Sequence, residues 1–173
     1  MNNVIVTNVV RFVVLILLQV LVLQRINLGG EYANLFHIII YPLFIILLPF
    51  RIPHALLVLL GFMAGISVDL FYDSLGIHAS AAVFIAFIRP TVLSLLAPAK
   101  GYNMNFSPTK ARFGVAWFLP YAATMMVLYL FFYFSVEVFT YYYIGQIMLR
   151  TICSFFLSML FITVVQFLFD PLD

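Results

Sequence analysis

The chain has 173 residues, of which 66% are hydrophobic and only 8% are charged. Soluble domains carry about 25% charged residues, so this composition excludes an ordinary soluble protein and predicts one that crosses a membrane several times. The formal net charge is only +2 and the sequence has no basic stripe, so it does not support a nucleic-acid-binding protein. A single cysteine, Cys153, excludes an intramolecular disulfide.

Apolar runs along the chain predict one all-α domain, residues 1–173, with six transmembrane helices. A helix needs about 20 apolar residues to cross the hydrocarbon core. The predicted spans cover residues 9–28, 34–50, 55–72, 77–96, 113–135 and 144–169. The first span is too long for a cleavable signal, so we expect it to be retained. The second contains Pro42, and we expect it to pack inside the bundle, where neighbouring helices satisfy the backbone groups that proline frees.

The distribution of lysine and arginine predicts that both termini are cytoplasmic. With six spans, the termini lie on the same side as the second and fourth loops. That side holds most of the basic residues: Arg11, Arg51, Lys100, Lys110 and Arg112, joined by Arg89 if the fourth span ends near it. The three cations of the fourth loop, Lys100, Lys110 and Arg112, fit anchoring to membrane lipids, and docking of a cytoplasmic protein is the alternative.

The stretch from Gly61 to Ala79 places small and polar residues into an otherwise apolar sequence. Gly61, Gly65 and Asp69 are four residues apart, so they lie along one face of the third predicted helix. The two glycines let another helix approach closely. That helix belongs either to the same bundle or to a partner protein, and the sequence leaves both alternatives open.

Asp69 lies about one turn before the predicted end of its helix, where an ionisable residue marks a candidate functional site. The alternatives are a carboxylate with a role in the bundle interior and one that is hydrated or caps the next helix. In the turn that follows, Asp73 and Ser74 offer N-cap oxygens for the fourth helix, and Gly76 permits a positive φ. We expect His78 to face Asp69 or Asp73 across this turn.

Arg89 and Pro90 place a permanent cation and a helix-breaking residue near the end of the fourth span. Pro90 is expected to kink this helix or to end it early. We expect the Arg89 side chain to reach the cytoplasmic lipid phosphates. The alternatives are a contact with a cytoplasmic partner and an ion pair inside the membrane.

The sequence contains no motif of a known catalytic or metal site. It has no Gly-x-Ser-x-Gly, no His-Glu-x-x-His and no phosphate-binding loop. His37, His54 and His78 do not have the spacing of metal ligands. We therefore expect a protein that is not an enzyme and that needs no metal or cofactor.

Short motifs along nearly the whole chain resemble those of the rod shape-determining protein MreD family, in the form found in Bacteroidetes. The first span contributes Arg11, Gln19 and Asn27 with their apolar neighbours, and the second contributes the segment from Pro42 to Pro49. The most specific motifs are Gly65-Ile-Ser-Val-Asp69, Leu75-Gly76-Ile77-His78-Ala79 and Phe87-Ile-Arg89-Pro90.

This resemblance implies a six-helix bundle similar to the substrate-binding S components of energy-coupling-factor transporters. It also implies a non-catalytic scaffold of the cell-elongation machinery in the bacterial inner membrane. The partners that it implies are MreC by direct contact and, through the complex, a RodA-type glycosyltransferase, a penicillin-binding transpeptidase and the actin-like MreB.

A second hypothesis for the same architecture is a small-molecule binding subunit of a vitamin transporter. It would use the outer loops and the region of Asp69 and His78 as a ligand pocket. The outer segments of the sequence are short and largely apolar and offer few convergent polar groups. This favours the scaffold over the transporter subunit.

Overall fold

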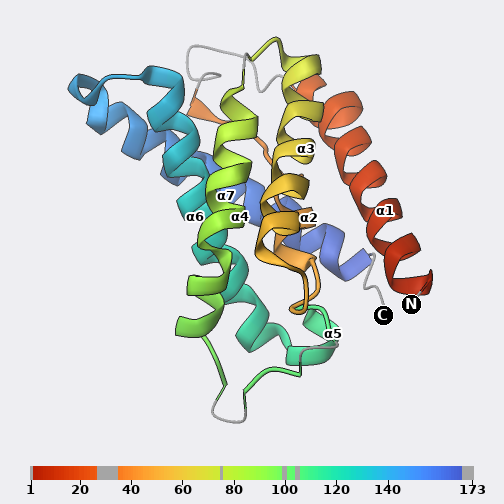
Figure 1. Ribbon diagram of the computed structural model, residues 1–173. Helices are drawn as coiled ribbons and strands as arrows, with labels where there is room; N and C mark the ends of the chain where they lie inside the picture. Colours follow the sequence, from red (N-terminus) through yellow and green to blue (C-terminus); the bar gives the residue numbers. More distant parts are fainter. Residues whose placement is uncertain (1, 27–34, 75, 99–100, 104–105, 169–173) are drawn as a thin grey trace.

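The computed structural model describes residues 2–26, 35–74, 76–98, 101–103 and 106–168, and the regular structure in these ranges is entirely helical (Figure 1). The helices are α1 (Asn2–Leu17), α2 (Leu43–Leu47), α3 (His54–Tyr72), α4 (Ile77–Leu95), α5 (Lys110–Phe113), α6 (Val115–Val138) and α7 (Ile144–Leu168). α1 continues as a π-helical turn, Leu18–Val22, and a 3₁₀ turn, Leu23–Arg25. Five helical stretches are long and apolar enough to cross a membrane: Ile5–Arg25, α3, α4, α6 and α7. The chain is therefore a multi-span membrane protein.

Successive helices pack side by side, and α4 lies between α3 and α6. α7 packs on α6, and α1 lies along α3 (Figure 1). Residues 73–76 join α3 to α4, and we call this end of the bundle the turn end; the start of α1 and α5 lie toward the opposite end, the α5 end. α4 passes through Pro90, which is exposed, and ends at Leu95, so the fourth span does not end early.

The outward faces of α1 and α7 are almost entirely apolar. Examples are Val6, Val10, Val13 and Leu17 on α1 and Ile152, Phe156 and Leu160 on α7, all of which are exposed. A helix that is apolar on all sides is typical of a membrane span. These faces are the surfaces that the bundle presents to lipid or to another membrane helix.

Residues 34–50, predicted as the second transmembrane helix, do not form one in the part that the structure describes. Residues 36–40 are extended, and α2, which follows Pro42, has only five residues. The β-branched residues Ile38–Ile40 favour extended backbone, and Pro42 lacks the N–H that a continuous helix would need. The expectation that this segment packs inside the bundle is confirmed, because every residue from Ile38 to Leu48 is buried.

Two serines of α7 form hydrogen bonds with the backbone of the extended segment. Ser154 accepts a hydrogen bond from the His37 N–H (2.9 Å) and donates one to the Leu35 carbonyl (3.3 Å). Ser158 accepts from the Ile39 N–H (3.0 Å) and donates to the His37 carbonyl (3.3 Å). The spacings match because four helical residues rise about 6 Å and two strand residues rise about 6.6 Å.

The opposite edge of the extended segment bonds to Gln19, which lies in the π-helical turn and is buried. Its Oε1 accepts from the Ile40 N–H (2.8 Å). Its Nε2 donates to the Ile38 carbonyl (3.0 Å) and to the Tyr72 hydroxyl (2.8 Å). Backbone at membrane depth must have its polar groups satisfied within the protein, and these side chains meet that requirement for a segment that is neither helix nor sheet.

Candidate functional site

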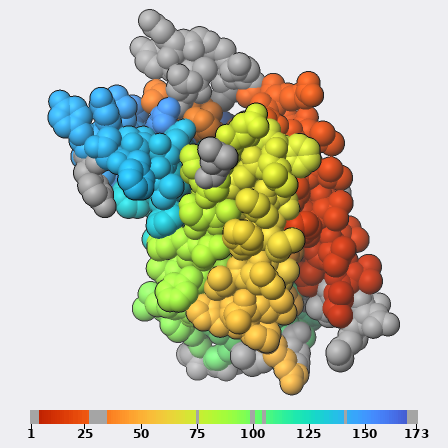
Figure 2. Space-filling view, turned by 45° about the horizontal axis from the view of Figure 1, so that its top comes forward, coloured from red at the N-terminus to blue at the C-terminus, as the bar shows by residue number. Residues whose placement is uncertain are grey.

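Gly61 and Gly65 face α4 at a close helix–helix contact within the same chain; Figure 2 shows the two helices as one continuous surface. A Cβ added at Gly61 would lie 2.9 Å from both the Ala82 carbonyl oxygen and the Ala86 Cβ. A Cβ added at Gly65 would overlap the backbone of Ala79. Of the two alternatives for this face, the structure gives packing within the bundle, and α4 leaves no space there for a partner's helix.

Asp69 caps α4 from the preceding helix. Its Oδ1 accepts hydrogen bonds from the Ser74 hydroxyl (2.6 Å) and the His78 N–H (3.0 Å), and its Oδ2 accepts from the Ala79 N–H (2.8 Å). The first N–H groups of a helix have no partner within it, and a carboxylate is also stabilised by the positive end of the helix dipole. Asp69 is therefore a buried capping carboxylate rather than a hydrated one.

The turn between α3 and α4 differs from the prediction in its capping residue. Gly76 has a φ of +84°, so the expected positive φ is confirmed. Asp73, in contrast, adopts a left-handed conformation with a φ of +50° and ends α3, and its side chain is exposed. The predicted N-cap role of Asp73 is wrong, because the carboxylate of Asp69 already binds the first N–H groups of α4.

The side chain of His78 also differs from the prediction, because it does not turn toward Asp69 or Asp73. Its Nδ1 lies 3.0 Å from the Tyr129 hydroxyl on α6. The Tyr129 hydroxyl is 2.7 Å from that of Tyr41, which donates to the His78 carbonyl oxygen (3.1 Å). The Asp69 carboxylate binds the backbone N–H of His78, so the imidazole ring is free to point across the bundle.

This chain of hydrogen bonds fixes the tautomer of His78. A carbonyl oxygen only accepts, so Tyr41 donates its proton to the His78 carbonyl and accepts from Tyr129. Tyr129 then accepts from Nδ1 of His78, which carries the hydrogen. Since a buried, unpaired imidazolium is costly, Nε2 carries a lone pair. This Nε2 is buried and has no hydrogen-bond partner among the described residues.

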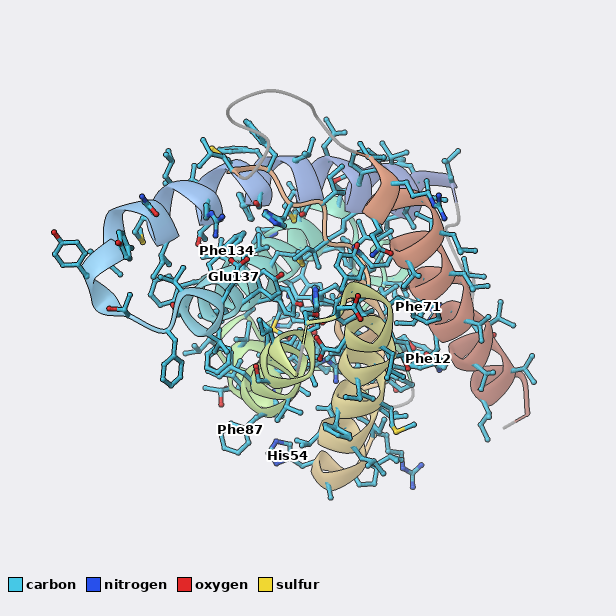
Figure 3. All side chains as sticks on the ribbon, turned by 90° about the horizontal axis from the view of Figure 1, so that it is seen from above. Phe12, His54, Phe71, Phe87, Phe134 and Glu137 are labelled. Carbon is cyan, nitrogen blue, oxygen red and sulfur yellow. The ribbon has the colours of Figure 1, made fainter. Side chains whose placement is uncertain are left out.

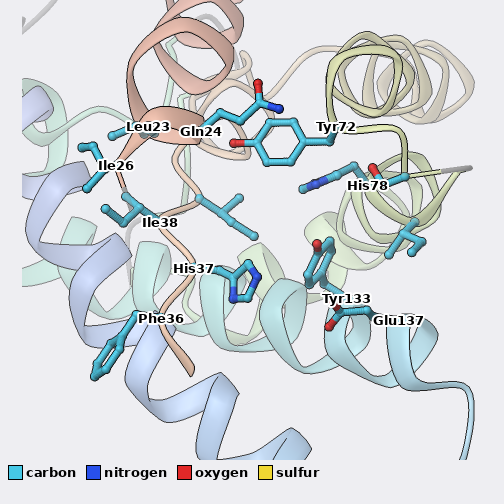
Figure 4. Close-up of a pocket in the computed structure, with 13 residues that line it drawn as sticks. Leu23, Gln24, Ile26, Phe36, His37, Ile38, Tyr72, His78, Tyr133 and Glu137 are labelled. Carbon is cyan, nitrogen blue, oxygen red and sulfur yellow. The ribbon is translucent and has the colours of Figure 1, made fainter. Parts of the chain in front are cut away.

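His78 lines a cavity of about 400 Å³ at the turn end of the bundle (Figure 4). Its walls come from the end of the first helical stretch, the extended segment, the α3–α4 turn and α6. Seven polar residues line it: Gln24, His37, Tyr72, Ser74, His78, Tyr133 and Glu137. The expectation that this region offers few convergent polar groups is therefore wrong, because those groups come from segments far apart in the sequence.

Glu137 is the charged residue in the described lining of the cavity. Its Oε2 accepts a hydrogen bond from Arg150 of α7 at 2.8 Å, and both side chains are partly exposed. Figure 3, seen from the turn end, places Glu137 near Phe134 inside the ring of helices, whereas His54 and Phe87 lie together at its outer edge. The ion pair thus ties α6 to α7 beside the cavity.

The sequence analysis missed the contribution of α6 to this site. Tyr129, Tyr133 and Glu137 are four residues apart, so they lie along one face of the helix. This spacing is the signal that could have indicated a polar stripe turned toward the bundle interior. Gln19, noted only as a residue of the family motif, also contributes to the site, because it donates a hydrogen bond to the hydroxyl of Tyr72, which lines the cavity.

Arg89 is buried, so the prediction that it reaches the lipid phosphates is wrong. Its Nε donates to the Tyr121 hydroxyl (2.9 Å), and one Nη donates to the carbonyls of Leu48 and Ile46 (3.5 Å to Ile46). The last carbonyls of α2 have no partner within that helix, and a cation is favourable at a helix C-terminus. Because α4 continues to Leu95, Arg89 lies inside the bundle rather than at the membrane surface.

The basic residues of the fourth loop pack in part on the bundle. Nζ of Lys110 lies 3.8 Å from the centre of the Phe167 ring, and the Arg112 guanidinium lies 4.3 Å from that of Phe106. These are cation–π contacts at the α5 end. Lys100 lies outside the described residues.

Comparison with known proteins does not assign the chain to a group: no family model, no curated protein and no solved structure matches it. Within the described residues, no group of three or more His, Cys, Asp or Glu side chains could hold a metal ion.

Proposed function

We propose that the chain is a non-catalytic scaffold of the MreD type, which acts in the bacterial inner membrane with MreC during cell elongation. The observation that carries the proposal is the placement of the motif residues. Gly65, Asp69 and Gly76 join α3 to α4, and Arg89 joins α4 to α2. Because these motif residues connect helices to one another, they fit a protein whose role depends on the shape of its helix bundle.

The proposal extends to the architecture and to the orientation. The segment from residue 35 to residue 50 runs between the two ends of the bundle (Figure 1), and we propose that it crosses the membrane as a sixth segment beside the five long helices. A bundle of six crossings resembles the S components of energy-coupling-factor transporters. Six crossings place both termini on one side of the membrane, and the basic residues at the α5 end favour the cytoplasm for that side.

Partner binding is expected to occur within the membrane. The described segments between helices are short, and the outward faces of α1 and α7 are apolar and long. A bitopic partner such as MreC carries a transmembrane helix that can pack on such a face through van der Waals contact. RodA-type glycosyltransferase, penicillin-binding transpeptidase and MreB would join through that complex.

The test is co-purification with MreC from the same genome in mild detergent. The tagged chain is expected to retain full-length MreC and to lose an MreC variant whose transmembrane helix is replaced by an unrelated one. Depletion of the chain from rod-shaped cells is expected to make them round. If full-length MreC is absent from the eluate and depleted cells keep their shape, the scaffold proposal is wrong.

The cavity at the turn end supports a second candidate function, that of a small-molecule binding subunit of a transporter. Its volume of about 400 Å³ and seven polar lining residues fit a ligand site. In this case an ATP-hydrolysing module, and not MreC, would co-purify with the chain. The same eluate therefore separates the two candidates.

A further inference from the structure

The cavity at the turn end has a chemistry that the scaffold role does not use. We propose that it binds a small, flat aromatic or heteroaromatic molecule that carries N–H donors and no negative charge. This inference goes beyond the scaffold function and does not depend on it. It rests on two buried nitrogens, on the charge of the lining, and on the size and aromatic walls of the cavity.

The first observation is the acceptor at His78. The residue is only 1% exposed, and its Nε2 has no partner among the described groups, although it is buried. The hydrogen-bond chain through Tyr129 and Tyr41 places the ring hydrogen on Nδ1, so Nε2 can only accept. A buried polar atom without a partner is unfavourable, and a ligand that donates a hydrogen bond would remove that cost.

A second buried imidazole nitrogen without a described partner comes from a different element. His37 lies in the extended segment, and its Nδ1 is buried and has no partner within the described part of the chain. Its ring packs edge-on against Phe134, with the ring centres 5.5 Å apart. Figure 4 shows the rings of His37, His78, Tyr72 and Tyr133 around one space. Two imidazole rings, each with a buried nitrogen that has no partner among the described residues, thus lie on opposite sides of the cavity.

The charge of the lining selects against anions. Neither lysine nor arginine is among the described residues that line the cavity, and Glu137 contributes a carboxylate. Arg150 binds Oε2 of this carboxylate from outside the lining, so Oε1 remains able to accept a hydrogen bond. A ligand with N–H donors, neutral or cationic, satisfies both the carboxylate and His78, whereas an anion would meet a like charge.

The size and walls of the cavity point to a flat ring system. A volume of about 400 Å³ lies at the lower end of the usual range for ligand pockets, about 300–1,000 Å³. Phe36, Tyr72 and Tyr133 provide aromatic surfaces, and the Tyr133 ring centre is 4.7 Å from that of His78. Aromatic faces favour stacked rings and also attract cations, so they match the same ligand class as the acceptors do.

The test compares two probes of nearly equal shape and opposite charge, benzamidine and benzoate, on the purified full-length chain in lipid nanodiscs. Benzamidine is planar and carries N–H donors, whereas benzoate carries only acceptors. The dissociation constant of each probe is measured by ligand-observed NMR, with empty nanodiscs as the blank. We expect benzamidine to bind at least tenfold more tightly than benzoate. Equal affinities, tighter binding of benzoate, or no binding of either probe would overturn the proposal.

Substitutions of lining residues test whether the probe binds in the cavity. Glu137→Gln removes the negative charge of the lining and Tyr133→Phe removes a hydroxyl, both while keeping its volume, and each is expected to weaken benzamidine binding at least fivefold. Tyr142→Phe makes the same change as Tyr133→Phe on a residue that is 86% exposed and outside the cavity, and it is expected to leave binding unchanged. Benzamidine binding that persists unchanged in both cavity variants would contradict the proposed site. Because MreC is absent from this assay, its outcome is independent of the scaffold test.

Discussion

Replacing Gln19 by leucine tests whether side chains hold the extended segment in place. The substitution keeps the volume of the side chain but removes the acceptor for the Ile40 N–H and the donor to the Ile38 carbonyl. Both backbone groups are buried at membrane depth, and leaving a buried donor or acceptor unsatisfied costs about 1–3 kcal/mol each. The expected loss of unfolding free energy is therefore about 2–6 kcal/mol, from two unpaired groups.

The assay is equilibrium unfolding of the purified chain in mixed micelles with increasing SDS. Gln24→Leu is the matched control, since it makes the same change five residues later in the chain. Gln24 is exposed and its Nε2 donates a single bond, to the Phe71 carbonyl (2.9 Å), so the control is expected to cost about 1 kcal/mol or less. If both variants unfold at the same SDS fraction, Gln19 does not stabilise the segment and the reasoning fails.

Three further substitutions test the contacts of the site by the same unfolding assay. Gly65→Ala would force its Cβ into the backbone of Ala79 and is expected to lower the unfolding free energy by about 1–3 kcal/mol or more. The Cβ of Gly145→Ala meets open space, so this control should lower it by nothing. Equal stability of the two variants would contradict the close contact. Asp69→Ala is expected to cost about 2 kcal/mol through loss of a helix cap. Asp73→Asn is expected to cost less than about 0.5 kcal/mol, because that side chain is exposed and asparagine tolerates its left-handed conformation; the reverse order would refute the capping role. Arg89→Met is expected to cost about 1.5–3 kcal/mol, and a neutral result would show that the α2 carbonyls do not need the guanidinium.

The five long helical stretches of the described chain lie close to five of the spans that the sequence predicts, because the signal for a membrane helix is local. A run of about 20 apolar residues is visible without knowledge of any contact. The structure of residues 35–50, predicted as the second span, could not be predicted correctly. Its hydrogen bonds come from Gln19 and from Ser158, which lie 21 residues before Ile40 and 119 residues after Ile39. No local pattern reports partners at that distance.

In the candidate site, too, the residues with local roles were predicted and those with distant partners were not. The sequence analysis placed Asp69 and Gly76 beside a helix boundary. A carboxylate there can cap a helix and a glycine can adopt a positive φ, and both roles can be recognised from the local sequence. It misplaced Arg89, because the carbonyls that bind the guanidinium belong to another element. It considered a ligand pocket in the region of Asp69 and His78 but discounted it, since the polar groups of His37, His78 and Glu137 come from three separate elements and meet only in the folded bundle.

The bonding of the extended segment to serines of α7 has a consequence for the order of biogenesis. Its N–H groups at His37 and Ile39 depend on Ser154 and Ser158, which lie 117 and 119 residues later in the chain, in α7. Until that helix enters the bilayer, the segment would expose unpaired backbone to hydrocarbon, at a cost of several kcal/mol per group. Residues 35–50 therefore reach their membrane position only after synthesis of α7, so insertion does not follow the order of the chain.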